Sequence, residues 1–186
     1  MTRTLYSRRN YLSNRGVNTI KDQAGNIVYI LAGRWGMMPA VMEVYDLSNH
    51  VLAQIRQRSL GVLPRFELYN ADQQMLGSIR RYYRVGPEIH FISGLNWVMI
   101  GSSVSFNYRV YHGRTLIMTI TSEAESHQQE LAITIEQSEN EAICLCLAAI
   151  LDFWAKKPQN KKSLKLSDKL HQLGGLSKKE LGYFKS

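Results

Sequence analysis

The chain has 186 residues, enough for one domain with a substantial core and a short appendage, and 45% of them are hydrophobic. Its net charge of +8 is uneven: residues 1–122 hold 14 basic and 6 acidic residues, residues 123–155 hold 7 acidic residues and no basic one, and residues 156–186 hold 9 lysines and 2 acidic residues. The arginines near the start precede no apolar segment, which argues against a signal peptide and predicts a cytoplasmic protein. Basic surfaces attract anionic lipids, nucleic acids or acidic proteins, and the alternative is that the charge only keeps the protein in solution.

A strand is expected near residues 5–12, and a repeated hairpin follows it. Three segments, 18–34, 42–58 and 66–82, are offset by 24 residues, and each reads as a strand, a turn rich in Asx or Gly, and a second strand. A fourth copy over 108–123 has a turn that is one residue shorter. The Asp or Asn that opens each of the first three turns can hydrogen-bond its own backbone and so fix the bend. These residues are Asp22, Asp46 and Asn70.

Apolar residues alternate along the hairpins, and their parity predicts which side chains point inward. The residues of this parity are Met42, Val44, Val51, Ala53, Ile55, Phe66, Leu68, Met75, Gly77, Ile79, Tyr108, Val110, Leu116, Met118 and Ile120. A period-two apolar face that continues through successive hairpins predicts an antiparallel sheet with one face on a core. The small members of the set, Ala53 and Gly77, are expected to leave room near something bulky.

An extra hairpin over 88–101 and a closing strand at 130–136 bring the expected count to twelve strands. A sheet of this size tends to close, which removes its exposed edges and leaves a lumen wider than its own side chains fill. The helix predicted over 140–155 is the candidate filler, because ten successive apolar residues leave it no polar face. It is too short to span a bilayer, which needs about 20 apolar residues. We therefore expect a mainly β protein, a closed antiparallel barrel of about twelve strands around a central buried hydrophobic α-helix.

Four residues in or just before the predicted helix have more specific interpretations. Ser138 and Glu141 are spaced as a capping box at its start. Cys144 and Cys146 point in different directions because they are two residues apart, so they cannot bridge each other. We expect buried thiols in a reducing cytoplasm, and the alternatives are lipidation or metal binding.

The hairpins with turns such as DQAGN, the segment ISGLNWVMIGSSVSFNYRV and the terminal apolar helix resemble the LURP-one-related family. The resemblance extends over about residues 5–156, and we expect a barrel domain over 1–156. That family belongs to the tubby C-terminal-like superfamily, together with phospholipid scramblases, and the resemblance implies a twelve-stranded barrel around a central hydrophobic helix. Tubby relatives bind phosphoinositide head groups through basic residues on the barrel wall, and scramblase relatives act at membranes. The chain lacks the Cys-rich segment and the Pro-rich N-terminus of scramblases, which argues against scrambling activity.

Residues 157–186 differ in composition from the rest of the chain. They begin as a basic polar linker and end in two short helical segments, broken at Gly174 and Gly175. So short a tail has little core of its own, so we expect it to pack on the barrel or on a protein partner. The alternative is a solvated tail.

Motifs for catalysis are absent from the sequence. The histidines, His50, His90, His112, His127 and His171, lack metal-ligand spacing. No G-x-S-x-G, P-loop or dinucleotide-binding fingerprint is present. These absences predict a protein that is not an enzyme and that holds no metal or cofactor.

Five arginines are the candidate binding residues: Arg34, Arg56, Arg58, Arg80 and Arg84. Arg56 follows Ile55, which is expected to point inward, and Arg80 has the equivalent position in the next hairpin, so both arginines should point outward. Arg34 and Arg58 are likewise equivalent to each other and share that outward parity, and Arg84 follows in the same phase if no bulge intervenes. Guanidinium groups form bidentate hydrogen bonds with phosphate, so the set predicts a site for an anionic head group. The alternative is that these are ordinary solvent-facing residues, some of them paired with acidic residues of the segment 123–141.

The leading interpretation is a non-enzymatic cytoplasmic barrel that binds an anionic ligand, such as a phospholipid head group, at the cytoplasmic membrane face. Tyr82 and Tyr83 are expected near that interface. The alternative is a protein-interaction scaffold, or a nucleic-acid-associated factor, that acts through the lysine-rich tail 157–186. Nucleic-acid binding is not expected because no recognisable module is present, and the sequence sets no oligomeric state.

Overall fold

The computed structural model describes residues 1–8, 12, 16–34, 40–59, 64–80, 88–123 and 130–156; of Arg34, Glu123 and Lys156 only the backbone is described. These residues belong to the first of two compact units, Met1–Lys156. The tail predicted over 157–186 lies outside the described residues, as do Arg84, Tyr82 and Tyr83.

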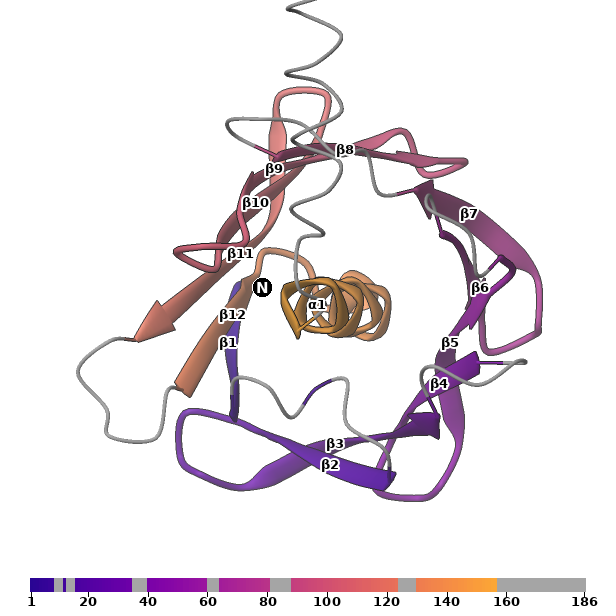
Figure 1. Cartoon of the computed structure of the whole chain (residues 1–186). Coiled ribbons are helices and arrows are strands. Elements are labelled where there is room, and N and C mark those ends of the chain that lie inside the picture. Colours follow the sequence, from indigo (N-terminus) through magenta and orange to yellow (C-terminus); the bar gives the residue numbers. More distant parts are fainter. Residues whose placement is uncertain are drawn as a thin grey trace, which may run out of the picture. The chain divides into compact units, whose positions relative to one another are not determined.

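Twelve antiparallel strands form a closed barrel, as the alternation of apolar residues predicts (Figure 1). Each strand pairs with its neighbours in the chain, and β1 closes the ring against β12. The strands are β1 (Arg3–Arg8), β2 (Gly16–Lys21), β3 (Ile27–Arg34), β4 (Ala40–Tyr45), β5 (Val51–Gln57), β6 (Arg65–Asn70), β7 (Met75–Arg80), β8 (Glu88–Ser93), β9 (Trp97–Ser102), β10 (Asn107–His112), β11 (Thr115–Glu123) and β12 (Glu130–Ile135). The predicted fold class is therefore confirmed.

The turns of the first three hairpins are fixed by their opening Asx residues, as predicted. The Asp22 carboxylate accepts a hydrogen bond from the Asn26 amide at 2.9 Å, and the Asp46 carboxylate accepts one from His50 at 2.8 Å. Asn70 accepts the equivalent bond from the Gln74 amide at 2.8 Å. A short polar side chain at this position can accept from the backbone of its own turn and so holds the two strands in register.

A β-bulge interrupts four of the hairpins at equivalent positions, and the sequence did not predict it. In the third hairpin Leu68 pairs with Gly77 and Tyr69 pairs with Met75, which leaves Leu76 as the extra residue. One extra residue reverses the alternation beyond it. The expected inward position of Met75 is therefore wrong, since its side chain is 54% exposed. The other bulges leave Val51 and Leu116 only half-buried for the same reason.

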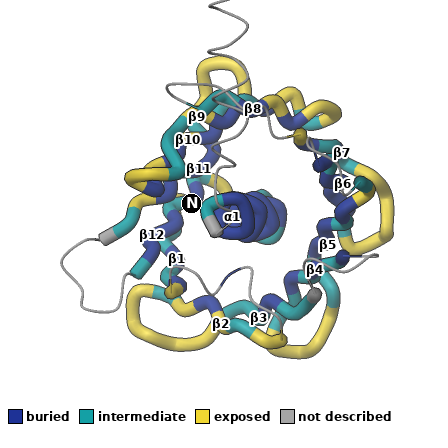
Figure 2. Tube along the Cα trace, in the orientation of Figure 1, coloured by how far each residue is buried: buried dark blue, intermediate teal, exposed yellow. Residues whose placement is uncertain are grey.

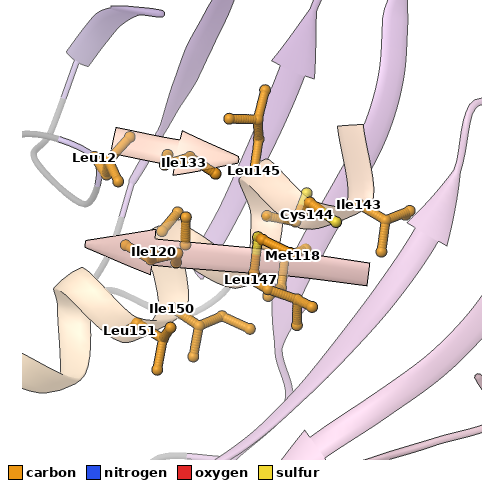
Figure 3. Close-up of a cluster of buried hydrophobic side chains, with 14 of the residues drawn as sticks. Leu12, Met118, Ile120, Ile133, Ile143, Cys144, Leu145, Leu147, Ile150 and Leu151 are labelled. Carbon is orange, nitrogen blue, oxygen red and sulfur yellow. The ribbon is translucent and has the colours of Figure 1, made fainter. Parts of the chain in front are cut away.

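The helix α1 (Glu141–Lys156) follows a short 3-10 turn, η1 (Ser138–Asn140), and lies inside the ring of strands (Figure 1). Every residue from 144 to 152 has no exposed surface, so the helix is dark blue throughout that length in Figure 2. It packs against β4, β5, β6 and β12. Figure 3 shows its aliphatic side chains beside those of β11 and β12, including Met118, Ile120 and Ile133. A helix without a polar face is stable in water only when it is enclosed on all sides.

Two details at the barrel interior differ from expectation. In place of the capping-box bond expected with Ser138, the Glu141 carboxylate accepts hydrogen bonds from the barrel wall, from the Tyr29 hydroxyl at 2.5 Å and from Arg3 at 3.2 Å. The space beside Gly77 is filled by the backbone of β8, because a Cβ on Gly77 would lie 2.3 Å from the Ser93 carbonyl oxygen. Glycine therefore lets β7 and β8 approach each other closely. Within the described residues, no helix combines the length and the hydrophobicity needed to cross a bilayer.

Candidate functional site

The predicted arginines whose side chains the structure describes lie on the outer face of β5 to β7. Ile55 and Ile79 point into the core with no exposed surface, so Arg56 and Arg80, which follow them, point outward. Arg58 lies just beyond the end of β5 and is exposed. For Arg34 the structure describes only the backbone, which ends β3 opposite Val41.

Strand register places three arginines in one row across neighbouring strands. The Arg58 amide donates to the Arg65 carbonyl oxygen at 2.9 Å, and Arg65 of β6 pairs directly with Arg80 of β7. We call Arg58, Arg65 and Arg80 the arginine row. The sequence analysis missed Arg65 because it selected arginines that recur at equivalent positions of the repeat. The positions equivalent to Arg65 hold Val17 and Val41 in the other hairpins. The outward parity that Arg65 shares with Glu67 was the signal that could have identified it.

A buried carboxylate organises the row from one side. Glu67 accepts hydrogen bonds from Arg58 at 2.6 Å and from the Tyr69 hydroxyl at 2.7 Å, and a guanidinium nitrogen of Arg65 lies 3.2 Å away. Burial raises the pKa of the Glu67 carboxyl, but the hydrogen bonds from Arg58 and Tyr69 and the nearby positive charges outweigh burial and lower it. The carboxylate therefore stays ionised and holds two arginines of the row in fixed positions.

Arg56 has no carboxylate partner among the described residues. Its guanidinium donates to the Gln54 amide oxygen at 2.5 Å and to Gln73, and it lies 4.4 Å from the ring centroid of Tyr69. Gln54 in turn donates to Glu43 of β4 at 2.5 Å. These two hydrogen bonds and the ring contact hold Arg56 against its own wall, which makes it a supporting residue there.

Arg80 has the opposite surroundings. Its side chain is exposed, and within the described residues no hydrogen bond or ion pair engages it. Arg65 also keeps an uncommitted donor, because its buried Nε has no hydrogen-bond partner there. Among the residues that the structure describes on β4 to β7 and at Arg58, four arginines stand against two carboxylates, Glu43 and Glu67, so this part of the wall is positively charged. The predicted alternative, pairing with acidic residues of 123–141, does not apply to Arg58, whose partner is Glu67.

A second polar cluster surrounds Glu88. Its carboxylate accepts hydrogen bonds from Ser103 at 2.5 Å and Tyr108 at 3.0 Å, and His90 lies 3.5 Å away. Burial raises the pKa of Glu88, but its proximity to His90 and the hydrogen bonds from Ser103 and Tyr108 lower it to about 2. His90 points inward, with its ring 4.9 Å from that of Trp154. One oxygen of the Glu88 carboxylate contacts Ser103, and the other contacts Tyr108 and His90.

The two cysteines are buried in α1, as predicted, and both are free thiols. Burial raises the pKa of both thiols, so neither forms a reactive thiolate at neutral pH. No group of three or more His, Cys, Asp or Glu residues is arranged to hold a metal ion in the part of the chain that the structure describes.

Comparison with known proteins agrees with this architecture. The family model described as LURP-one-related matches residues 3–152. An uncharacterized protein YxjI of Bacillus subtilis (strain 168) is 22% identical over 148 residues, which are 80% of this chain and 91% of that protein. An X-ray structure of a protein from Arabidopsis thaliana has a TM-score of 0.58 at 15% identity and covers 83% of this chain and 92% of its own. At such low identity, the structural similarity is evidence for the fold alone.

Proposed function

The chain belongs to the LURP-one-related family, and we propose that this member is a non-enzymatic, tubby-like barrel that binds the phosphate of a phospholipid head group at the cytoplasmic face of a membrane. The binding residues in this proposal are Arg58, Arg65 and Arg80, and the ligand is held on the outer wall of β5, β6 and β7.

The observation that supports the proposal is the arginine row. Neighbouring strands lie about 4.8 Å apart, so one phosphate group can contact the side chains of two adjacent strands. Glu67 fixes Arg58 and Arg65 at 2.6 Å and 3.2 Å, while Arg80 is exposed. Fixed guanidinium groups lose little conformational freedom on binding. Arg80 can offer a bidentate fork to a phosphate, and Arg58, which donates to Glu67 and to the Tyr69 hydroxyl, contributes its remaining N–H groups.

Vesicle co-sedimentation tests the proposal with the full chain. The probe is phosphatidylcholine vesicles with and without 20% phosphatidylinositol phosphate, at low and high salt. We expect binding only to the anionic vesicles, weakened by salt because the attraction is electrostatic. Replacing Arg80 with Gln should weaken binding about fivefold, since each basic residue at such a surface contributes about 1 kcal/mol.

Arg114→Gln is the matched control, because Arg114 is also exposed but lies in the turn between β10 and β11. Equal losses for Arg80→Gln and Arg114→Gln would mean that only net charge matters, which contradicts a site at the arginine row. Loss of binding on deletion of 157–186 alone would instead favour the scaffold function of the lysine-rich tail. Absence of vesicle binding at low salt would reject the lipid proposal.

A further inference from the structure

An exposed apolar surface covers the outer face of β8 and β9. Phe91 and Ile100 are 61% and 40% exposed, and Ile89 and Val98 are half-buried. We call these four residues the apolar patch, since register pairs Phe91 with Val98 and Ile89 with Ile100 and so places them in two neighbouring rows. The turns from β8 to β11 lie at the ends of the strands and leave the patch uncovered. Contiguous exposed apolar side chains of this kind mark a contact surface.

The charge around the patch has one sign. The sequence from 89 to 122 contains no acidic residue and two arginines, Arg109 on β10 and Arg114 in the turn that follows it. Arg109 is exposed and pairs directly with Ile100 of the patch. The carboxylate of Glu88, which precedes this segment, belongs to the polar cluster on the inner face. The β10 side of the patch therefore attracts anions.

A second arginine borders the patch on its β7 side. The last pair between β7 and β8 joins Ile79 to Ile92, and both side chains point inward with no exposed surface. Arg80 and Phe91 are the next residues of the two strands, and both point outward. β8 and β9 therefore lie between two strands that each carry an outward arginine, β7 and β10 (Figure 1). An apolar surface with basic residues beside it is typical of proteins that bind anionic membranes.

A groove beside Arg109 gives the β10 side room for a polar group. Its volume is about 710 Å³, and it extends from Ile100 of β9 across β10 to Thr121 of β11. Tyr111 and Thr119 also line it, and Thr119 pairs directly with Arg109. Ligand pockets have volumes of roughly 300–1,000 Å³, so the groove is large enough for a lipid head group. Hydroxyl groups beside a guanidinium suit a phosphate and its polar substituents.

We propose that the apolar patch enters an anionic membrane at the boundary between head groups and acyl chains, while Arg80 and Arg109 bind lipid phosphates on either side of it. This inference rests on the proposed function, because Arg80 belongs to the arginine row. Apolar faces of this kind enter a bilayer by about 5–10 Å, which is enough to bury the side chain of Phe91. The barrel wall is convex, so the patch enters deepest and the two arginines stay level with the phosphates.

Charge argues against two other occupants of the patch. A second copy of the chain would bring arginines of its own against Arg80 and Arg109. The tail of this chain holds 9 lysines and 2 acidic residues over 156–186, so the same two arginines repel it. An anionic bilayer presents negative phosphates above an apolar interior, which complements both parts of the surface. A partner protein is distinguished from a membrane by where the patch lies when vesicles are bound.

A fluorophore on the patch tests the inference with the full chain. Phe91→Cys and Val17→Cys are each labelled with a nitrobenzoxadiazole group. Val17 is the matched control because it is 68% exposed on β2, which lies six strands from β8 on the opposite side of the ring. Cys144 and Cys146 are buried, and the unaltered protein controls for labelling at these thiols.

The probe is phosphatidylcholine vesicles with 20% phosphatidylinositol phosphate. We expect stronger, blue-shifted emission from labelled Phe91→Cys and quenching by nitroxide-labelled lipids, with no change for Val17→Cys. Vesicle binding without a change for Phe91→Cys, or with equal changes for both variants, would overturn the inference and leave the phospholipid proposal standing. The patch would then be assigned to a partner protein. Absence of vesicle binding at low salt would overturn both proposals.

Unlabelled variants test the contribution of the patch to affinity. Phe91→Ser should weaken vesicle binding about tenfold, because a phenylalanine side chain is no longer buried in the apolar region. That loss should persist at high salt, since ions screen charges but not apolar burial, whereas the effect of Arg80→Gln should shrink. Val17→Ser should bind vesicles like the unaltered protein. Equal affinities of Phe91→Ser and Val17→Ser would overturn the insertion of the patch.

Discussion

Phe66 and Leu68 of β6 point into the barrel with no exposed surface, while their neighbours Glu67 and Tyr69 point outward and are only 8% and 7% exposed. Both faces of one strand are therefore buried, but by different means. The inner face is covered by the apolar helix α1, which packs on β6. The outer face is covered by the long polar side chains of its own neighbours, including Arg58 and Arg65.

Because the two faces are buried by different means, we expect the inner face to determine the stability of the protein and the outer face to determine what it binds. Inner residues gain free energy from removal of apolar surface, so their contribution grows with the area buried. Outer residues exchange hydrogen bonds with water for hydrogen bonds with each other, which yields a small net gain but fixed geometry. We expect substitutions inside the barrel to change stability strongly, and substitutions outside it to change mainly what the surface can bind.

The largest effect should come from a charge inside the barrel. Leu147 of α1 has no exposed surface, so Leu147→Lys places an ammonium group where it has no partner. The cost is several kcal/mol or more, comparable with the whole stability of a domain of about 5–15 kcal/mol, and the protein should not fold. Circular dichroism during thermal unfolding is the measurement, with Leu147→Met as the control that conserves volume. A soluble Leu147→Lys protein that melts cooperatively would contradict the enclosed helix.

A cavity inside the barrel should have the next largest effect. The ring of Phe66 lies 5.9 Å from that of Phe153 and 5.8 Å from that of Trp154. Phe66→Ala should lower the free energy of unfolding by about 3–5 kcal/mol in urea denaturation, because it removes both the buried ring and its contacts. Phe91→Ala is the control, since Phe91 is 61% exposed and its loss should cost less than about 0.5 kcal/mol. Similar losses for the two variants would mean that β6 does not face the core.

Glu67→Gln probes the outer face, and its effect should depend on pH. At pH 7 we expect a loss of about 1–3 kcal/mol, because the charged acceptor of Arg58, Arg65 and Tyr69 is removed. The pKa of Glu67 is lowered from 4.5 in the folded protein, so its stabilisation is complete above about pH 4.5 and is lost as the pH falls through the folded pKa. The difference between the two proteins should therefore shrink in acid, as urea denaturation at pH 7 and pH 3 can show.

Glu139→Gln is the matched control for Glu67→Gln, since Glu139 is exposed on η1 and its substitution should change the free energy of unfolding by less than about 0.5 kcal/mol. A difference between wild type and Glu67→Gln that stays constant from pH 7 to pH 3 would mean that the carboxylate does not stabilise the fold through its charge.

The smallest effect on stability is expected at Met75. Alternation along the strand predicts that this side chain points inward, but the bulge turns it outward. Met75→Thr should change the free energy of unfolding by less than about 0.5 kcal/mol. Gly77→Ala, two residues along the same strand, should destabilise clearly, because its Cβ would lie 2.3 Å from the Ser93 carbonyl oxygen. Thermal unfolding of the two variants compares them directly, and a larger loss for Met75→Thr would overturn the placement of the bulge.

The barrel could be predicted from the sequence because apolar residues occupy every second position along many successive strands and form its inner face. Ile55, Leu68 and Ile79 could be assigned inward from alternation alone, and all three have no exposed surface. The rule fails at Met75 because a bulge is a feature of how two strands pair, and no single strand encodes it. Asp22, Asp46 and Asn70 were recognisable because a turn is local and its chemistry lies within five residues.

The outer wall was less predictable than the core. Alternation places Arg56 and Arg80 outside, but it gives no partners, and so it could not distinguish the engaged Arg56 from the exposed Arg80. Arg65 and Glu67 belong to the same wall through register with β5 and β7, which depends on the length of the connections.

The order of elements along the chain has a consequence for synthesis. The strand that closes the ring, β12, and the helix that fills it, α1, are the last parts of the barrel to leave the ribosome. Translation proceeds at about 5–20 residues per second. The apolar side chains of the first eleven strands therefore stay exposed for several seconds before β12 and α1 have been synthesised. A truncated protein that ends before Glu141 should therefore depend on chaperones and form inclusion bodies when overproduced. We expect the complete chain to form them less readily.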